Sequence, residues 1–378
     1  MDFVNFLMAL SPIVVVLVGI LGFKKSAKTV SPAALLWTLF LAFTYFNLGG
    51  ATFAENVKVL DPLVWKGIKE GLKIVLMVFG AFTILNLLRE TGAIEDVKST
   101  IAQISDDRRV QVVIIGMMLP IFLEGAAGAG APAAIAAPFL VALGFHPTTA
   151  IAVALLGDAM PASWGGAGLT TINGGAALVD AGLSIMCTFG YIFWVDLVII
   201  LCGILGALTL GVRFKTYKAV CLRTVSSVLP VLITMGSLLI VAYIMQSPST
   251  GMMNLLASDI AAVVGSFYPA AAVLIGSSGA FITGTGLGSN IMFAQMHIDA
   301  AASLGMNPIT VFAGQNAGAS LGNLICPNNT VAACATVDQV GNESEVMKKT
   351  FKAFAIILVL YMALAMLYTC VLFPHFGA

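Results

Sequence analysis

The feature that most constrains the fold is a carboxylate, Glu124, set with three glycines at residues 123–132 inside an otherwise apolar run. The flanking stretches, 112–122 and 133–143, are each only about half of the ~20 residues that a membrane-spanning helix requires. Two short apolar arms joined by small residues predict a re-entrant hairpin. Irregular backbone at membrane depth is stable only inside protein or beside a wet cavity. An ionisable group placed there indicates a functional site.

Composition places this hairpin in a membrane protein. The chain is 59% hydrophobic and 10% charged, whereas a soluble domain carries about 25% charged residues. The expected fold class is therefore an all-α polytopic membrane protein, with the lipid bilayer as its partner. A formal net charge of +0 gives no basis for binding nucleic acid. The six cysteines include no C-x-x-C pair and the three histidines lie far apart, so neither a metal site nor a cofactor is predicted.

Apolar runs and basic residues together predict the topology. About eight full spans of membrane length can be placed, near 4–22, 31–48, 71–89, 149–163, 184–212, 225–246, 309–326 and 353–373. Lys and Arg gather in alternate connections, as they do in cytoplasmic loops. This alternation holds only if 110–143 and 268–300 each enter and leave on one side. The first hairpin is then predicted to enter from the cytoplasm and the second from outside, with both termini outside the cytoplasm.

An internal repeat supports this topology. The Leu-Gly-x-x-Pro turn at 143–147 recurs at 304–308, an offset of 161 residues (308 − 147), and at the same offset Gly157 falls on Gly318. Three crossings separate the two units, so they are predicted to be inverted. Inverted repeats with discontinuous helices are typical of secondary transporters.

Each hairpin is followed by a span that small and polar residues interrupt. Pro161 and Pro327 each remove a backbone donor there, and neighbouring glycines weaken the helix. The second half of a broken helix begins with free N–H groups that favour an anion. The predicted organisation is N-terminal spans at 1–65, a first repeat at 66–183 (hairpin 110–143, broken helix 147–170), a connecting span at 184–223, a second repeat at 224–335 (hairpin 268–300, broken helix 307–330) and a C-terminal span at 336–378. Short helices at the membrane interface are predicted at 93–107 and 250–264.

The hairpin tips and helix breaks contain small residues, amides and hydroxyls, without Lys or Arg. Backbone N–H groups and hydroxyls can hold a small carboxylate without a fixed cation. The predicted substrate-binding residues are Gly125, Ala126, Gly128, Gly130, Ser163, Thr285, Gly286, Ser289, Asn290, Gln315, Asn316 and Ser320.

Acidic residues are scarce in the predicted membrane core. We identify Glu124 and Asp158, with Asp196 as a helix-packing residue. Desolvation disfavours the charged form of a buried carboxyl, so either acid is a candidate proton carrier, with Glu124 the first choice and Asp158 the second. His297 is interpreted as an interfacial residue at the end of the second hairpin.

Residues 123–132 resemble the lactate permease family, in which a Leu-Glu-Gly-Ala-Ala-Gly-x-Gly-Ala-Pro run is a hallmark. The resemblance continues through 161–168, resumes at 281–290 and 316–345, and covers roughly 110–345 of this chain. It implies a cytoplasmic-membrane symporter that takes up lactate, and often glycolate, with protons. Carried over by matching motif, the leading site candidates are Glu124, Gly125, Gly128, Gly130, Thr285, Ser289 and Asn290.

The expected function is therefore proton symport of a small monocarboxylate, L-lactate first and D-lactate or glycolate next. Familiar family members are longer, and Asp158 stands where they carry an amide, which points to altered coupling or a different 2-hydroxy acid. The alternative is a sodium-coupled carrier of a dicarboxylate or sugar acid, with Na⁺ held around Asn290 and Asn328. A passive channel is a lesser alternative. An enzyme is not expected, because the predicted core lacks a nucleophile–base pair or metal-ligand set. A homodimer is left open.

Overall fold

The computed structural model describes residues 3–19, 23, 25, 27–50, 52–93, 96, 99–100, 104–105, 107–126, 131–175, 178, 204–205, 207–209, 211–339 and 341–376. Within these residues every regular element is helical, which confirms the all-α prediction. Asp196 and most of the span predicted at 184–212 lie outside the described residues.

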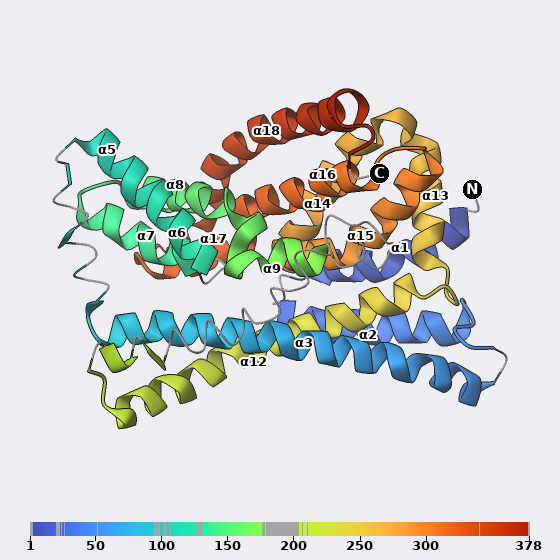
Figure 1. The fold of residues 1–378 in the computed structure, drawn as a ribbon, viewed down its shortest axis with the longest axis horizontal. Helices are drawn as coiled ribbons and strands as arrows, with labels where there is room; N and C mark the ends of the chain where they lie inside the picture. Colours follow the sequence, from blue (N-terminus) through green and yellow to red (C-terminus); the bar gives the residue numbers. More distant parts are fainter. Residues whose placement is uncertain are drawn as a thin grey trace.

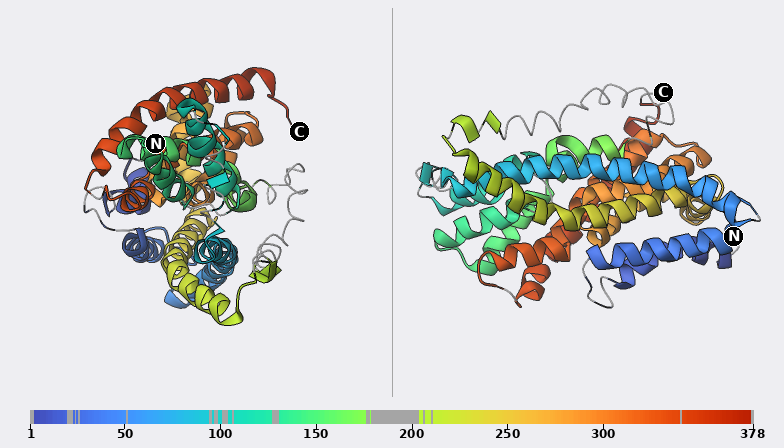
Figure 2. Two further views of the ribbon diagram at one scale, coloured as in Figure 1. Left: turned by 90° about the vertical axis from the view of Figure 1, so that its left-hand side faces the viewer. Right: turned by 90° about the horizontal axis from the view of Figure 1, so that it is seen from below.

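The helices form two layers. Three of them run along the long axis in the lower layer of Figure 1, and the end view in Figure 2 shows the same separation. These helices are α2 (Ala27–Thr44), α3 (Phe53–Glu90) and α12 (Phe214–Gln246). Helix α1 (Phe3–Leu17) packs against α2 and against α13 (Met252–Val264) of the other layer.

Two units with the same order of elements make most of the upper layer. Each has a helical arm, a second arm, a Gly-x-x-Pro connection, a helix, one 3₁₀ turn and a last helix, and residues 127–130 between the arms of the first unit lie outside the described residues. The first unit consists of α5 (Arg108–Val113), η2 (Ile114–Met118), α6 (Leu119–Ala126), α7 (Ala131–Ala142), α8 (Pro147–Ala159), η3 (Ala162–Trp164) and α9 (Gly165–Gly174). The second consists of α14 (Tyr268–Thr283), α15 (Gly286–Ser303), α16 (Pro308–Gly322), η6 (Asn323–Ile325) and α17 (Pro327–Ala335).

The turns that start the two broken helices are alike. Gly144 and Gly305 both adopt positive φ, +84° and +64°. In both turns the N–H of the next residue donates to a carbonyl five positions back, which is the Schellman C-cap that glycine favours. Pro147 and Pro308 then open the following helices, where a missing N–H costs nothing.

The broken helix of each unit crosses the first hairpin arm at a glycine. A Cβ on Gly157 would meet the carbonyl of Gly116 in η2, and a Cβ on Gly318 would meet the carbonyl of Val273 in α14. Such close backbone approach is possible only for small residues, as in membrane helix packing generally. The two glycines are the pair that the sequence offset aligns, so the contact supports the predicted repeat. The inversion of the units stays a prediction.

The first arm of the second hairpin, α14, is continuous with the helix that precedes it. The short helix predicted at the interface, 250–264, is α13, whose Met252 and Met253 are buried in the core shared with α1 and α15. It continues into α14 through η5 (Gly265–Phe267), with a bend at Gly265 (φ +54°). The segment is thus packed into the helical core, and its location at the membrane interface stays a prediction.

The helices coincide in part with the predicted spans, and the number of spans stays a prediction. Among the described residues, the helical stretches long and apolar enough to cross a membrane alone are Met252–Phe281 and Glu343–Leu372. The span predicted at 71–89 is part of the longer α3, and α3 and α12 run through the predicted boundaries at 65/66 and 223/224. The division into units stays a prediction.

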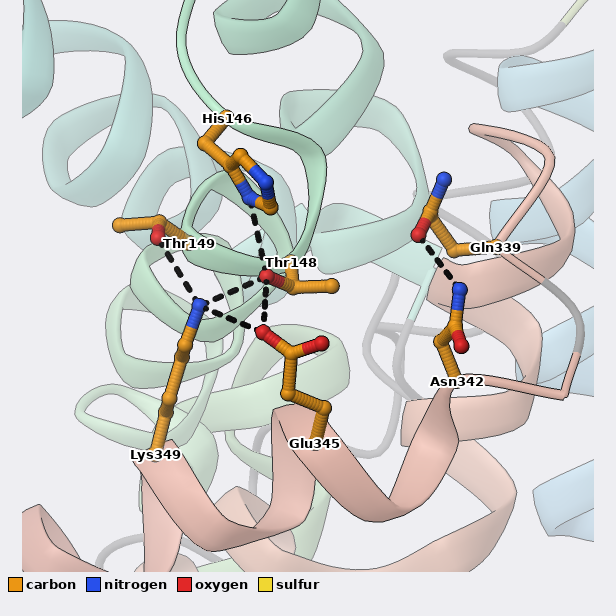
Figure 3. A network of polar contacts seen from close by, with 7 residues as sticks. All are labelled: His146, Thr148, Thr149, Gln339, Asn342, Glu345 and Lys349. Atoms are coloured by element: carbon orange, nitrogen blue, oxygen red, sulfur yellow. Dashed lines mark hydrogen bonds and ion pairs between the residues drawn. The ribbon is translucent and has the colours of Figure 1, made fainter.

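The C-terminal helix α18 (Glu343–Leu367), which continues as η7 (Tyr368–Leu372), is fixed to the first unit by a polar network at its start (Figure 3). Lys349 Nζ donates to Thr148 Oγ1 at 2.6 Å and lies 3.1 Å from Glu345 Oε1. The Thr148 hydroxyl also bonds Glu345 Oε1 at 3.0 Å and His146 Nδ1 at 3.0 Å. The network therefore holds α18 against the first turn of α8.

Replacing Gly318 with valine tests the close crossing of α16 and α14. We expect Gly318→Val to lower the stability by about 1–3 kcal/mol or more, because the new side chain collides with backbone. Thermal unfolding of the purified protein in detergent measures the loss. Gly236→Ala in α12 is the control, because a Cβ there meets no atom within 4 Å. Equal unfolding temperatures for both variants would contradict the packing described.

Candidate functional site

Glu124 and Asp158 lie together near the tip of the first hairpin. Glu124 belongs to α6 and Asp158 to α8, and their side chains are 3% and 1% exposed. The two carboxyl groups contact each other, and Asp158 also accepts the backbone N–H of Ala133. That N–H belongs to the first turn of α7, where helical N–H groups lack partners within the helix. A Cβ on Gly165 would meet Glu124 Oε1, so the start of α9 closes the pair on another side.

While it is buried, this pair must hold at least one proton. Glu124 Oε2 and Asp158 Oδ1 are buried without a hydrogen-bond partner, and within the described residues no salt bridge joins either acid to a cation. Two carboxylates in contact, away from water, cannot both carry charge. The pair therefore titrates as a unit. The sequence predicted the two acids as separate candidates, and the structure brings them together.

A second polar cluster lies between the second hairpin and α16. His297 Nε2 lies 2.8 Å from Gln315 Oε1, and His297 Nδ1 lies 3.0 Å from the Tyr268 hydroxyl. Gln315 Nε2 donates to Ser289 Oγ at 2.9 Å and to Asn290 Oδ1 at 3.3 Å. All five side chains are fully buried. His297 is thus a core residue, and its interpretation as interfacial is wrong.

The cluster extends into the first unit. Asn290 Nδ2 donates to the Thr170 carbonyl at 3.1 Å and to Asn316 Oδ1 at 2.8 Å. Asn316 Nδ2 donates to Thr171 Oγ1 at 2.9 Å, and this hydroxyl donates to the Ser163 carbonyl at 2.6 Å. The bonds therefore join α15 and α16 of one unit to η3 and α9 of the other.

Hydroxyls complete the contact at the two helix breaks. Ser163 Oγ bonds Ser320 Oγ, and Ser320 Oγ donates to the Asn316 carbonyl at 3.1 Å. Ser163 and Asn316 are half-buried. Ser163 is also two residues from Gly165, which touches Glu124. The acidic pair and the hydroxyl–amide cluster are therefore neighbours.

The structure unites the polar residues predicted for substrate binding. Ser163, Ser289, Asn290, Gln315, Asn316 and Ser320 form one network. Thr285 instead caps α15 by accepting the N–H of Gly288 at 3.0 Å. Gly286 packs against Thr170, and Gly125 directly follows Glu124. Ala126 ends α6, whereas Gly128 and Gly130 lie outside the described residues.

Sequence reasoning missed four residues at or near the network. Thr170 and Thr171 were not considered, although they follow Ser163 by seven and eight residues, the spacing of one helix face. Tyr268 opens the second hairpin and gave no signal beyond its single hydroxyl. Asp299, also in this hairpin, was overlooked as a membrane acid; Gln295 donates to its Oδ1 at 2.9 Å.

Comparison with known proteins decides the family. A family model described as L-lactate permease matches residues 5–186 and 176–373. The chain belongs to the L-lactate permease family. That family is one of membrane transporters rather than enzymes, in agreement with the sequence prediction.

Individual members of the L-lactate permease family match parts of the chain. The L-lactate permease of Escherichia coli strain K12 is 30% identical over 154 residues, 41% of this chain and 26% of that protein. The L-lactate permease of Halalkalibacterium halodurans is 31% identical over 167 residues, 44% of this chain and 30% of that protein. A glycolate permease of Escherichia coli is 28% identical over 174 residues, 45% of this chain and 29% of that protein. The matched stretches thus span under a third of these relatives.

Replacing Asn290 with aspartate tests the network. A carboxylate at this position would face the Thr170 carbonyl and Asn316 Oδ1 as a third acceptor, so we expect a stability loss of roughly 1–3 kcal/mol or more. Asn254→Asp, at an exposed position of α13, is the matched control. Thermal unfolding in detergent compares them. If Asn290→Asp unfolds at the same temperature as Asn254→Asp and the unmodified protein, the hydrogen bonds of Asn290 do not contribute to stability as described.

Proposed function

We propose that this chain is a proton-coupled carrier of a small monocarboxylate across the cytoplasmic membrane, with L-lactate the first substrate. Membership of the L-lactate permease family supports a carrier of this class. The names of the matched relatives, L-lactate permease and glycolate permease, support a short 2-hydroxy acid as cargo. D-lactate and glycolate are the next candidates.

The observation that carries proton coupling is the contact between Glu124 and Asp158. A buried carboxyl pair that holds one proton can release it when the site opens to water of higher pH. Because the helix start at Ala133 stabilises charge on Asp158, Glu124 is the better proton-carrying member. A proton taken up together with a substrate anion cancels the charge of the cargo, which lowers the cost of moving it through an apolar barrier.

The substrate carboxylate is proposed to lie beside Ser163 and Asn316. Ser163 and Asn316 are half-buried, as is Thr171 between them in the network, whereas the amides of Asn290 and Gln315 are fully buried. Hydroxyl and amide N–H donors suit a single carboxylate, and the adjacent acid pair would repel a cargo with more negative charge. Ser289, Asn290 and Gln315 then support the site from behind, while Gly125, Gly128, Gly130, Thr285 and Gly286 shape the tips.

Alternating access is proposed to come from movement of the hairpin units against the lower layer. The hairpin of the first unit, with α5, lies toward one end of the long axis, and the hairpin of the second unit, α14 and α15, lies toward the other (Figure 1). This placement is what hairpins entering from opposite faces require. We propose that the first enters from the cytoplasm and the second from outside, with both termini outside the cytoplasm. A homodimer stays a prediction.

Uptake of labelled L-lactate into proteoliposomes tests the function, with proton and sodium gradients varied independently. An inward proton gradient should drive accumulation, and replacing Na⁺ with choline should leave it unchanged. Collapse in choline would instead favour the sodium-coupled alternative. No uptake of L-lactate, D-lactate or glycolate under any gradient would reject the proposed substrate class.

Variants of the acid pair locate the proton in the same assay. Glu124→Gln imitates the protonated carboxyl, so we expect exchange of internal for external lactate to persist while gradient-driven accumulation falls by about tenfold or more, equivalent to at least 1.4 kcal/mol. Asp158→Asn should weaken accumulation less. Asp338→Asn, in an exposed turn, is the control. Full accumulation by Glu124→Gln would remove this residue from the proton pathway.

A further inference from the structure

The polar network between the two units has a defined direction, which two backbone carbonyls set. The Thr170 carbonyl can only accept a hydrogen bond, so the Asn290 group that faces it must be the amide NH₂. Asn290 Oδ1 is then directed at Gln315, whose own NH₂ must donate to it. Ser289 gives the same result independently, because its hydroxyl donates to the Gly276 carbonyl and so accepts from Gln315.

This direction reaches His297 and fixes its tautomer. With its NH₂ committed, Gln315 presents Oε1 to the imidazole, so His297 Nε2 must carry a hydrogen. In the neutral ring Nδ1 is then an acceptor, and the Tyr268 hydroxyl donates to it. A His297 ring with its hydrogen on Nδ1 alone would set two acceptors against each other and turn the Gln315 amide around.

Followed away from His297, the series of hydrogen bonds ends at the candidate substrate site. Asn316 Oδ1 accepts from Asn290, so the NH₂ of Asn316 faces Thr171, which takes one of its two hydrogens. The Thr171 hydroxyl in turn donates its hydrogen bond to the Ser163 carbonyl. The same series of hydrogen bonds therefore also fixes the direction of the second N–H of the half-buried Asn316 amide, which is left to donate to a ligand.

We propose that His297 is a positioning residue: held in its Nε2-protonated form by Tyr268, it orients Gln315, Asn290 and Asn316 so that the Asn316 amide N–H is presented to the substrate carboxylate. The part that concerns substrate rests on the proposed function. The acidic group that acts electrostatically on Tyr268 is Asp299, two residues after His297 in α15, with Gln295 donating to its Oδ1. Among the described residues, the titratable group hydrogen-bonded to the His297 ring is Tyr268, and Asp299 is not bonded to it.

Nitrogen NMR of protein labelled with ¹⁵N-histidine tests the tautomer without any substrate. The chain has only three histidines, His146, His297 and His375, and His297→Gln assigns the signal by its loss. We expect the Nε2-protonated neutral form of His297 in the unmodified protein and a mixture of tautomers in Tyr268→Phe. An Nδ1-protonated ring in the unmodified protein would overturn the proposal.

Lactate uptake by variants tests the effect on the site. His297→Leu should raise the KM about tenfold, the loss expected when one buried hydrogen bond no longer orients its partner. His297→Gln should restore the KM to within about threefold, because its amide can donate from the Nε2 position. Tyr268→Phe keeps the ring volume and should raise the KM by an intermediate factor. His375→Leu, at an exposed position, is the control and should match the unmodified protein.

The outcomes separate the inference from the proposed function. A KM for His297→Leu and Tyr268→Phe equal to that of the unmodified protein would overturn the positioning role. Equal impairment of His297→Gln and His297→Leu would do the same, since a role in packing alone does not depend on an N–H donor. If the unmodified protein shows the expected tautomer but takes up no small monocarboxylate, the proposed function fails while the directed network stands.

Discussion

Polar groups buried in an apolar protein must find partners, and that requirement shapes the centre of this molecule. An unpaired amide or carbonyl costs several times what a formed hydrogen bond contributes net. Asn290 meets the requirement across the boundary between units, by donating to Thr170 and to Asn316. The network therefore does more than fill the interface. It makes the position of α9 and the orientation of amides in α15 and α16 depend on each other.

Glycine makes that meeting point possible. The hairpin arms approach α8 and α16 so closely that a methyl group at Gly157 or Gly318 would strike backbone. In each unit this contact holds the first hairpin arm directly against the broken helix. At the start of its second arm, Gly286 of the second unit packs on Thr170 of the first. Small residues thus set the distances, and polar residues determine which groups face each other.

Local signals in the sequence were enough to predict the turns and breaks. Gly144 with Pro147, Gly305 with Pro308, and the interruption after Asp158 appear in the structure as helix ends or 3₁₀ turns. Glycine, proline and polar residues inside apolar runs act through backbone conformation, so their effect is readable without knowing the fold.

Contacts between distant segments could not be predicted in this way. That Asp158 contacts Glu124, or that Asn290 meets Thr170, depends on how helices pack, and spacing along the chain carries no such information. The packing of the segment 250–264 into the core was missed for a related reason. A helix with Asn254 and Ser258 exposed on one face has the same sequence pattern at a membrane interface and on the outside of a packed core. His297 gave the same ambiguity, because one polar residue in an apolar run is equally compatible with both locations.

The central claim is that the two hairpins reach toward each other from opposite faces of the bilayer. Labelling of single cysteines by a membrane-impermeant maleimide, in a cysteine-free background, tests it at the exposed hairpin ends Arg109, Ala142, Ser266 and Ser303. The account predicts that positions 109 and 142 react only from the cytoplasmic side and positions 266 and 303 only from outside. Reaction of all four from one side, or of the two ends of one hairpin from different sides, would contradict it.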